Sequence, residues 1–120
     1  MPETRGGTGA DRLTVTAAAD GDVSVLTVSG EIDHDTGAPL REALLDATIG
    51  EHPHVLLDLS AVTFMDSSGL NILLSAHRNA TEAGGWLRLA GTNANVLRIL
   101  QIVGVDTIID LYPTVPAALA

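Results

Sequence analysis

Residues 54–76 read HVLLDLSAVTFMDSSGLNILLSA, and this stretch decides the fold class. Residues 54–60 form an almost unbroken apolar run, which is typical of a strand at the centre of a parallel sheet. Residues 68–83 have apolar positions at helical spacing, and Gly84 and Gly85 end the predicted helix. A buried strand followed closely by an amphipathic helix predicts an α/β fold.

The helix predicted over residues 68–83 should bury one face only. That buried face is expected to contain Leu70, Leu73, Leu74, His77 and Ala80. Ile72 and Ala76 fall outside this stripe, so we expect them to form an exposed apolar strip. A short loop is expected to connect the strand at residues 54–60 to the MDSSGL segment.

Working outward from this stretch, the remaining elements follow from periodicity and turn residues. Strands are predicted at 13–19, 23–32, 86–92 and 107–112, and helices at 38–49, 95–103 and near the C-terminus. Asp33 to Thr36 offer several N-caps for the first helix. The expected fold is a mixed, mostly parallel sheet of four to five strands with an N-terminal β-hairpin, covered by helices. Residues 1–11 are expected to be a flexible tail, and residues 12–120 one domain.

The composition excludes several classes of function. The chain has 120 residues, no cysteine, and a net charge of −9 from 15 acidic and 6 basic residues, all of them arginine. The negative charge disfavours nucleic-acid binding. Without lysine there is no Walker-type phosphate loop and no Schiff-base chemistry. No apolar run is long enough for a membrane helix or a signal peptide, so we expect a cytoplasmic protein without membrane contact.

No pattern of catalytic or metal-binding residues is evident. Asp33, Asp35, Asp58 and Asp66 lie near predicted strand ends, where turn and capping roles account for them. The four histidines lack zinc spacing, and no G-x-S-x-G elbow accompanies the serines. We therefore expect a protein that is not an enzyme, with no cofactor and no metal.

Asp66-Ser67-Ser68-Gly69 places two hydroxyl groups at the predicted start of a helix. One capping residue suffices for one helix, so the second serine is unexplained. An exposed serine at the positive end of a helix dipole is a position where a phosphate group is tolerated.

Three segments resemble the STAS domains of bacterial anti-sigma factor antagonists. They read LLDLSAVTFMDSSGLNILL, VLTVSGEIDHDTGAPLREAL and, more weakly, NVLRILQIVGVDTIIDLY. The resemblance runs in order from Leu13 to Ala118, with family-like spacing.

The resemblance implies a switch. In that family the serine after the aspartate, here Ser67, is phosphorylated by the cognate anti-sigma factor, an ATP-dependent serine kinase. The unphosphorylated antagonist binds the anti-sigma factor and releases the sigma factor, and a serine phosphatase resets the system. Ser68 is then expected to be the helix cap.

The expected contact surface for the anti-sigma factor surrounds Ser67. It comprises Asp33, Asp66, Ser68, Gly69, Asn71, Ile72 and Ser75. Two alternatives stay open at this point. One is a STAS subunit that no longer cycles through phosphorylation, for example in a lipid-transport complex. The other is a nucleotide-binding module or small α/β enzyme.

Overall fold

A computed structural model describes residues 12–119 of the chain. These residues form one five-stranded sheet in which the strands lie in chain order, β1-β2-β3-β4-β5. β1 pairs with β2 in antiparallel fashion, and every later pair is parallel. The expected mixed sheet with an N-terminal hairpin is therefore confirmed. The tail expected at residues 1–11 lies outside the described residues.

The order of elements along the chain also agrees with the prediction from the sequence. The strands are β1 (Leu13–Asp20), β2 (Val23–Ile32), β3 (His54–Met65), β4 (Trp86–Ala90) and β5 (Asp110–Tyr112). The α-helices are α1 (Ala38–Ala47), α2 (Ser67–Glu82), α3 (Ala94–Ile102) and α4 (Val115–Leu119), and a 3₁₀ turn, η2, spans Val105–Thr107.

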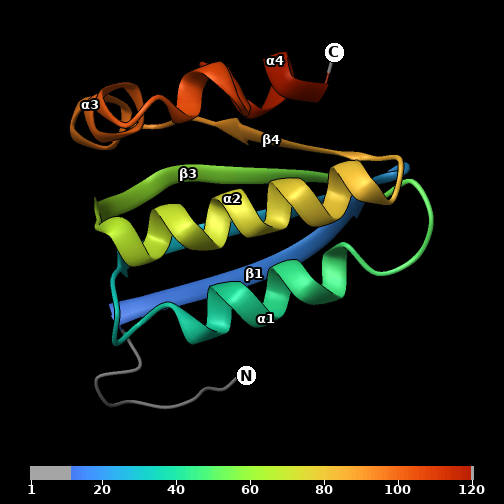
Figure 1. The fold of residues 1–120 in the computed structure, drawn as a ribbon, viewed down its shortest axis with the longest axis horizontal. Helices are drawn as coiled ribbons and strands as arrows, with labels where there is room; N and C mark the ends of the chain where they lie inside the picture. The colour runs from blue at the N-terminus through green and yellow to red at the C-terminus, as the bar shows by residue number, and fades with distance from the viewer. Residues whose placement is uncertain (1–11, 120) are drawn as a thin grey trace.

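The helices cover the two faces of the sheet unequally. Leu57 of β3 belongs to a large core cluster that includes buried side chains of α1, α2 and α3, whereas its neighbour Leu56 packs with Ala118 of α4 in a small second cluster. Because successive residues of a strand point to opposite faces, α4 lies on the face away from α1 and α2. Figure 1 shows α1 and α2 running side by side along the sheet.

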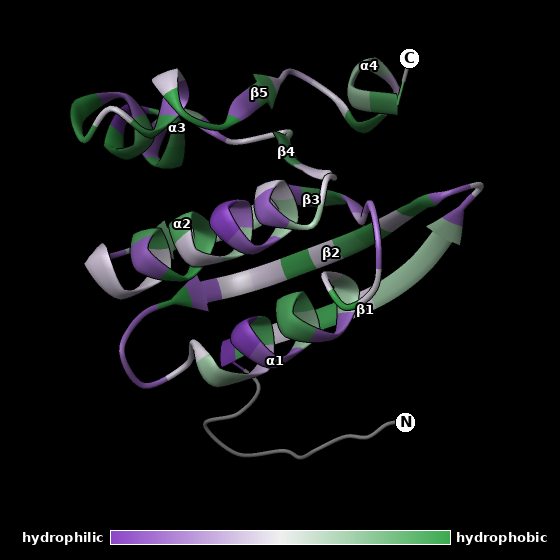
Figure 2. Cartoon of the chain, turned by 45° about the vertical axis from the view of Figure 1, so that its right-hand side comes forward, coloured by the Kyte–Doolittle hydropathy of each residue, from purple (hydrophilic) through white to green (hydrophobic). Residues whose placement is uncertain are grey.

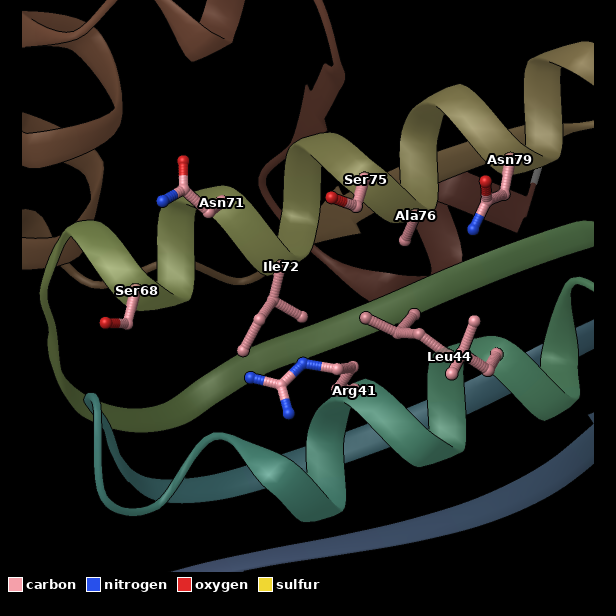
Figure 3. A pocket seen from close by; sticks show the side chains of 9 residues that line it. Arg41, Leu44, Ser68, Asn71, Ile72, Ser75, Ala76 and Asn79 are labelled. Atoms are coloured by element: carbon pink, nitrogen blue, oxygen red, sulfur yellow. The ribbon is translucent and has the colours of Figure 1, made fainter.

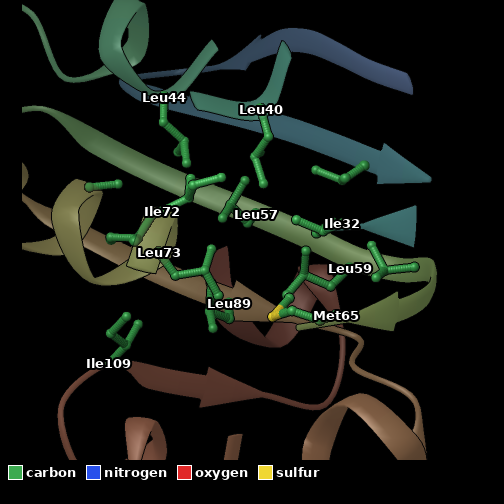
Figure 4. Close-up of a cluster of buried hydrophobic side chains, with 14 of the residues drawn as sticks. Ile32, Leu40, Leu44, Leu57, Leu59, Met65, Ile72, Leu73, Leu89 and Ile109 are labelled. Atoms are coloured by element: carbon green, nitrogen blue, oxygen red, sulfur yellow. The ribbon is translucent and has the colours of Figure 1, made fainter. Parts of the chain in front are cut away.

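The main core lies between the sheet and the α1–α2 layer. Figure 4 shows side chains from both helices and from the strands pointing toward one another. Those drawn there with labels and no more than 2% exposed are Ile32, Leu40, Leu44, Leu57, Leu59, Met65, Leu73, Leu89 and Ile109. Branched aliphatic side chains therefore supply most of the stabilising burial.

β3 is longer than expected, and the loop predicted after residue 60 is wrong. The strand continues to Met65, with Val62 and Met65 buried and Phe64 46% exposed. Residues 61–65 of β3 stay paired because β2 runs beside them up to Ile32, which lies opposite Met65 at the end of the paired strands. A partner strand far away in sequence thus keeps residues 61–65 extended.

The exposed strip expected on the second helix is also wrong. Ile72 is 7% and Ala76 3% exposed, whereas Leu74 and His77 of the predicted buried stripe are only half-buried. The reason is that α1 packs beside α2 and covers the side that carries Ile72 and Ala76. α2 therefore buries two sides, one against the sheet and one against α1.

The last strand is shorter than predicted. Residues 105–107 form the turn η2 instead, and Ile109 is buried in the core before β5 begins at Asp110. Pro116 lies in the first turn of α4, where a missing N–H leaves no helical hydrogen bond unmade.

Replacement of Leu57 by alanine is expected to destabilise the domain strongly. The side chain is fully buried between the sheet and the helices, and such truncations cost about 2–5 kcal/mol. Urea denaturation measures the change in the free energy of unfolding. The matched control is Ile102→Ala, which removes an aliphatic side chain that is 75% exposed and should change stability by less than about 0.5 kcal/mol. Equal losses in both variants would contradict the assignment of the core.

Candidate functional site

The candidate site lies at one edge of the sheet, where β2 and β3 both end. Because these strands are parallel, the loop after β2 and the helix after β3 begin side by side. The Asp66 backbone N–H donates a hydrogen bond of 3.1 Å to the carbonyl oxygen of Ile32. This bond fixes the position of the first turn of α2 relative to the loop at residues 33–37, which is strongly hydrophilic at its start (Figure 2).

Asp66, not Ser68, caps α2. The Asp66 backbone is extended, and its carboxylate accepts hydrogen bonds from the backbone N–H groups of Ser68, at 2.8 Å, and Gly69, at 3.3 Å. The expectation that Ser68 is the cap is therefore wrong. The physical reason is that the helix begins at Ser67, so both serines are helical residues and the capping position falls on the aspartate.

The two serines have different surroundings. Ser67 is exposed at the first helical position, and within residues 12–119 its hydroxyl group makes no hydrogen bond. Ser68 is half-buried and lines a groove between α1 and α2. The hydroxyl group of Ser67 is thus the one directed to the outside of the molecule.

Gly69 allows the first turn of α2 to lie close to the strand ends. A Cβ atom at this position would lie 2.7 Å from Met65 Cγ and 2.8 Å from Ile32 Cγ2. Such distances are shorter than van der Waals contact, so a side chain here would force the helix or the side chains of Met65 and Ile32 to move. Gly69 is itself buried, which gives it a packing role at the site.

The loop after β2 is held by its own side chains. The Asp33 carboxylate accepts hydrogen bonds from the backbone N–H groups of Asp35, at 2.9 Å, and Thr36, at 3.0 Å. The buried Thr36 hydroxyl donates to the Glu31 carbonyl at 2.6 Å and accepts from the Asp33 N–H at 2.9 Å. The prediction that residues 33–36 cap the first helix is wrong, because its N-cap is Gly37, which has no side chain to form a capping bond.

Arg12 ties this loop to the hairpin. Its guanidinium group lies 2.6 Å from Asp33 Oδ2 and 3.0 Å from Glu31 Oε1. Sequence reasoning did not single out Arg12, although a signal existed. In the hairpin the paired residue numbers sum to a constant, as in Leu13 opposite Gly30, and this register places Arg12 opposite Glu31.

These contacts shift the pKa values of Asp33 and Arg12. Partial burial raises the pKa of Asp33, but hydrogen bonds from Thr36 and Asp35 and the positive charge of Arg12 outweigh it, so the pKa lies below its ordinary value. The hydrogen bond to Glu31, together with the charge of Asp33, raises the pKa of Arg12. The Arg12–Asp33 pair therefore stays charged throughout the neutral range.

A groove runs between α1 and α2 and starts at Ser68. Its volume is about 230 Å³, and it is lined by Arg41, Leu44, Leu45, Ser68, Asn71, Ile72, Ser75, Ala76 and Asn79. Figure 3 shows the polar residues of α2 along one side and Arg41 of α1 on the other. Of the contact residues predicted from the sequence, Asn71 and Ser75 are exposed along this groove, and Ile72 forms part of its apolar lining.

The predicted carboxylates do not all meet at this site. Asp33 and Asp66 lie at the shared strand edge, whereas Asp58 lies within β3 and accepts hydrogen bonds from Ser60. In the part of the chain that the structure describes, no three histidine, aspartate or glutamate side chains converge as metal ligands would. None of the helices between residues 12 and 119 combines the length and apolarity needed to span a membrane.

Comparison with known proteins gives consistent results. The sequence model of the STAS domain matches residues 14–118. Anti-sigma-F factor antagonist RsfB of Mycobacterium tuberculosis is 32% identical over 109 residues, which cover 91% of this chain and 88% of that protein. An anti-sigma F factor antagonist of Paenibacillus polymyxa is 32% identical over 75% of this chain and 78% of that protein. The crystal structure of an anti-sigma factor antagonist from Mycobacterium paratuberculosis superimposes with a TM-score of 0.83 at 32% identity, covering 93% of this chain and 95% of that one.

Replacement of Asp33 by asparagine should alter how stability depends on pH. The pKa of Asp33 is depressed in the folded state, so its contribution is complete above the unfolded pKa of about 3.9 and is lost as the pH falls through the folded value. We expect the Asp33→Asn variant to be less stable than the original chain at pH 6. The difference should shrink below about pH 4. Urea denaturation at pH 6, 5, 4 and 3 measures it, and a difference that stays constant over this range would contradict the assignment.

Proposed function

The chain belongs to the STAS domain family, and we propose that it acts as an anti-sigma factor antagonist controlled by phosphorylation of Ser67. The unphosphorylated form binds a cognate anti-sigma factor and thereby releases a sigma factor. The anti-sigma factor is also the ATP-dependent serine kinase that modifies Ser67, and a serine phosphatase reverses the modification. We place this cycle in the cytoplasm, with the chain as a substrate of the kinase and not as an enzyme.

The surroundings of Ser67 carry this proposal. Its hydroxyl group is exposed at the start of α2 and has no hydrogen bond within residues 12–119, so a kinase can reach it without local unfolding. Ser68, in contrast, is half-buried and faces the groove. The names of the relatives that are about a third identical to this chain support the role of antagonist.

Asp66 makes the site sensitive to added charge. Its carboxylate already accepts the backbone N–H groups of Ser68 and Gly69, the donors with which a helix N-terminus would otherwise stabilise an anion. A phosphate group on Ser67 would add about −1.5 to −2 charge beside that carboxylate. The two backbone N–H groups that Asp66 engages are therefore not available to neutralise the added charge.

The effect on a partner follows from this charge. A surface that fits a neutral hydroxyl group would have to accommodate a hydrated dianion beside Asp66, and like charges at an interface are costly. A loss of roughly 2–4 kcal/mol of binding free energy weakens association about 30- to 1000-fold. Such a factor is enough for a switch, and the fold of the domain need not change.

The partner surface extends from Ser67 in two directions. Toward the loop it includes Asp66 and Asp33, which the Arg12 contact holds in place. Along the helix it includes Ser68, Asn71 and Ser75, which line the groove. Gly69 and Ile72 are buried, so we propose that they contribute by packing and by forming the groove floor.

The site of modification can be mapped directly. The purified chain is incubated with ATP and, one at a time, each serine-kinase anti-sigma factor of the source organism, and phosphopeptides are then sequenced. We expect modification of Ser67 that is lost in Ser67→Ala and kept in Ser68→Ala. Both variants should remain folded, because neither hydroxyl group caps the helix.

Two results would contradict the proposal. Modification of Ser68 alone would show that the phosphorylated hydroxyl group is that of Ser68 and not that of Ser67. If none of these kinases modifies the chain, while each phosphorylates a control antagonist, the phosphorylation cycle does not operate on this protein.

A further inference from the structure

The groove between α1 and α2 has a charge opposite to that of the whole chain. The chain carries a net charge of −9, yet the nine residues that line the groove include Arg41 and no acidic residue. This contrast distinguishes the groove from a surface of average composition. It favours a partner group that is negatively charged.

Arg41 is available to such a group. Residues three and four positions away on α1 are Ala38, Leu44 and Leu45, and Gly37 precedes the helix, so no acidic residue lies at the spacing that forms ion pairs within a helix. Among the described residues, Arg41 takes part in no ion pair, in contrast to Arg12. Figure 3 shows its guanidinium group directed along the groove toward the end that carries Ser68.

Apart from Arg41, the groove has an apolar floor and a row of neutral polar side chains along α2. Leu44, Ile72 and Ala76 are nearly buried and form an apolar floor. Asn71, Ser75 and Asn79 follow one another along α2 at helical spacing and offer amide and hydroxyl groups. An occupant therefore needs an apolar side chain for the floor and an acidic group for Arg41.

The size of the groove favours a protein side chain over a free small molecule. Its volume of about 230 Å³ is below the roughly 300–1,000 Å³ of typical small-molecule sites. A single guanidinium group without a second cation is also a weak trap for a free anion, whereas one arginine suffices to orient a carboxylate on an already docked surface.

We propose that Arg41 is a specificity-determining contact that pairs with an aspartate or glutamate of the anti-sigma factor, whose neighbouring apolar side chain fills the groove. This inference rests on the proposed function and adds a second anchor to it, on α1, next to the switch at Ser67. The pairing selects partners with an acidic residue at this position.

Binding of the cognate anti-sigma factor to a series of variants tests this inference. Isothermal titration is performed with the original chain, Arg41→Lys, Arg41→Gln and Arg41→Glu. We expect binding to weaken about tenfold or more in Arg41→Gln. The loss should be larger in Arg41→Glu, and Arg41→Lys should retain part of the affinity. Added salt should weaken binding of the original chain more than that of Arg41→Gln.

The matched control is Arg78→Gln. Arg78 is an exposed arginine of α2 that lines a different hollow, with Leu74 and Ile108. Its replacement changes the net charge of the chain equally, so an equal loss of binding in both variants would show a general effect of charge and overturn the inference. A charge-exchange experiment identifies the pair. In it, each acidic residue of the anti-sigma factor surface is changed to arginine, and the variant that restores binding to Arg41→Glu contains the partner of Arg41.

The outcomes separate the inference from the proposed function. If the original chain binds and Arg41→Gln binds equally well, Arg41 is not a contact, while the antagonist role stands. If the original chain binds no anti-sigma factor of its source organism, both fail. If size-exclusion chromatography shows self-association that Arg41→Gln abolishes, the groove holds a second copy of this chain, and the proposed occupant is wrong.

Discussion

The candidate site depends on one constraint, the parallel pairing of β2 and β3 up to the last residue of each strand. Ile32 lies opposite Met65, and the next N–H group, that of Asp66, donates to the Ile32 carbonyl. This places the loop after β2 beside the first turn of α2. Gly69 then lets the helix approach both strand ends without steric conflict. The position of the Ser67 hydroxyl group follows from these backbone contacts.

Much of the fold could be predicted from local pattern, because apolar runs and helical spacing report which segments are buried. The errors arose where burial depends on a distant partner. Residues 61–65 are part of a strand because β2 extends beside them. Ile72 and Ala76 are buried because α1 covers them. Neither partner is evident from the segment itself, so periodicity alone predicts a loop and an exposed strip.

The site was only partly predictable for a similar reason. The DSSG motif pointed to the start of a helix, yet the choice between Asp66 and Ser68 as cap depended on placing the helix boundary to within two residues. Arg12 could have been found from the hairpin register. Arg41 had no signal of its own, since a lone arginine on a helix is usually a solvated side chain. Arg41 becomes a candidate contact residue because it lines the groove, and the groove forms only when α1 and α2 pack together.

The central claim is that charge on Ser67 controls association with the anti-sigma factor. The most direct test compares the affinity of one anti-sigma factor for the chain before and after stoichiometric phosphorylation of Ser67, by isothermal titration at fixed ionic strength. The account predicts that binding weakens about 30- to 1000-fold while the circular dichroism spectrum stays the same. Equal affinities for the two forms would contradict it.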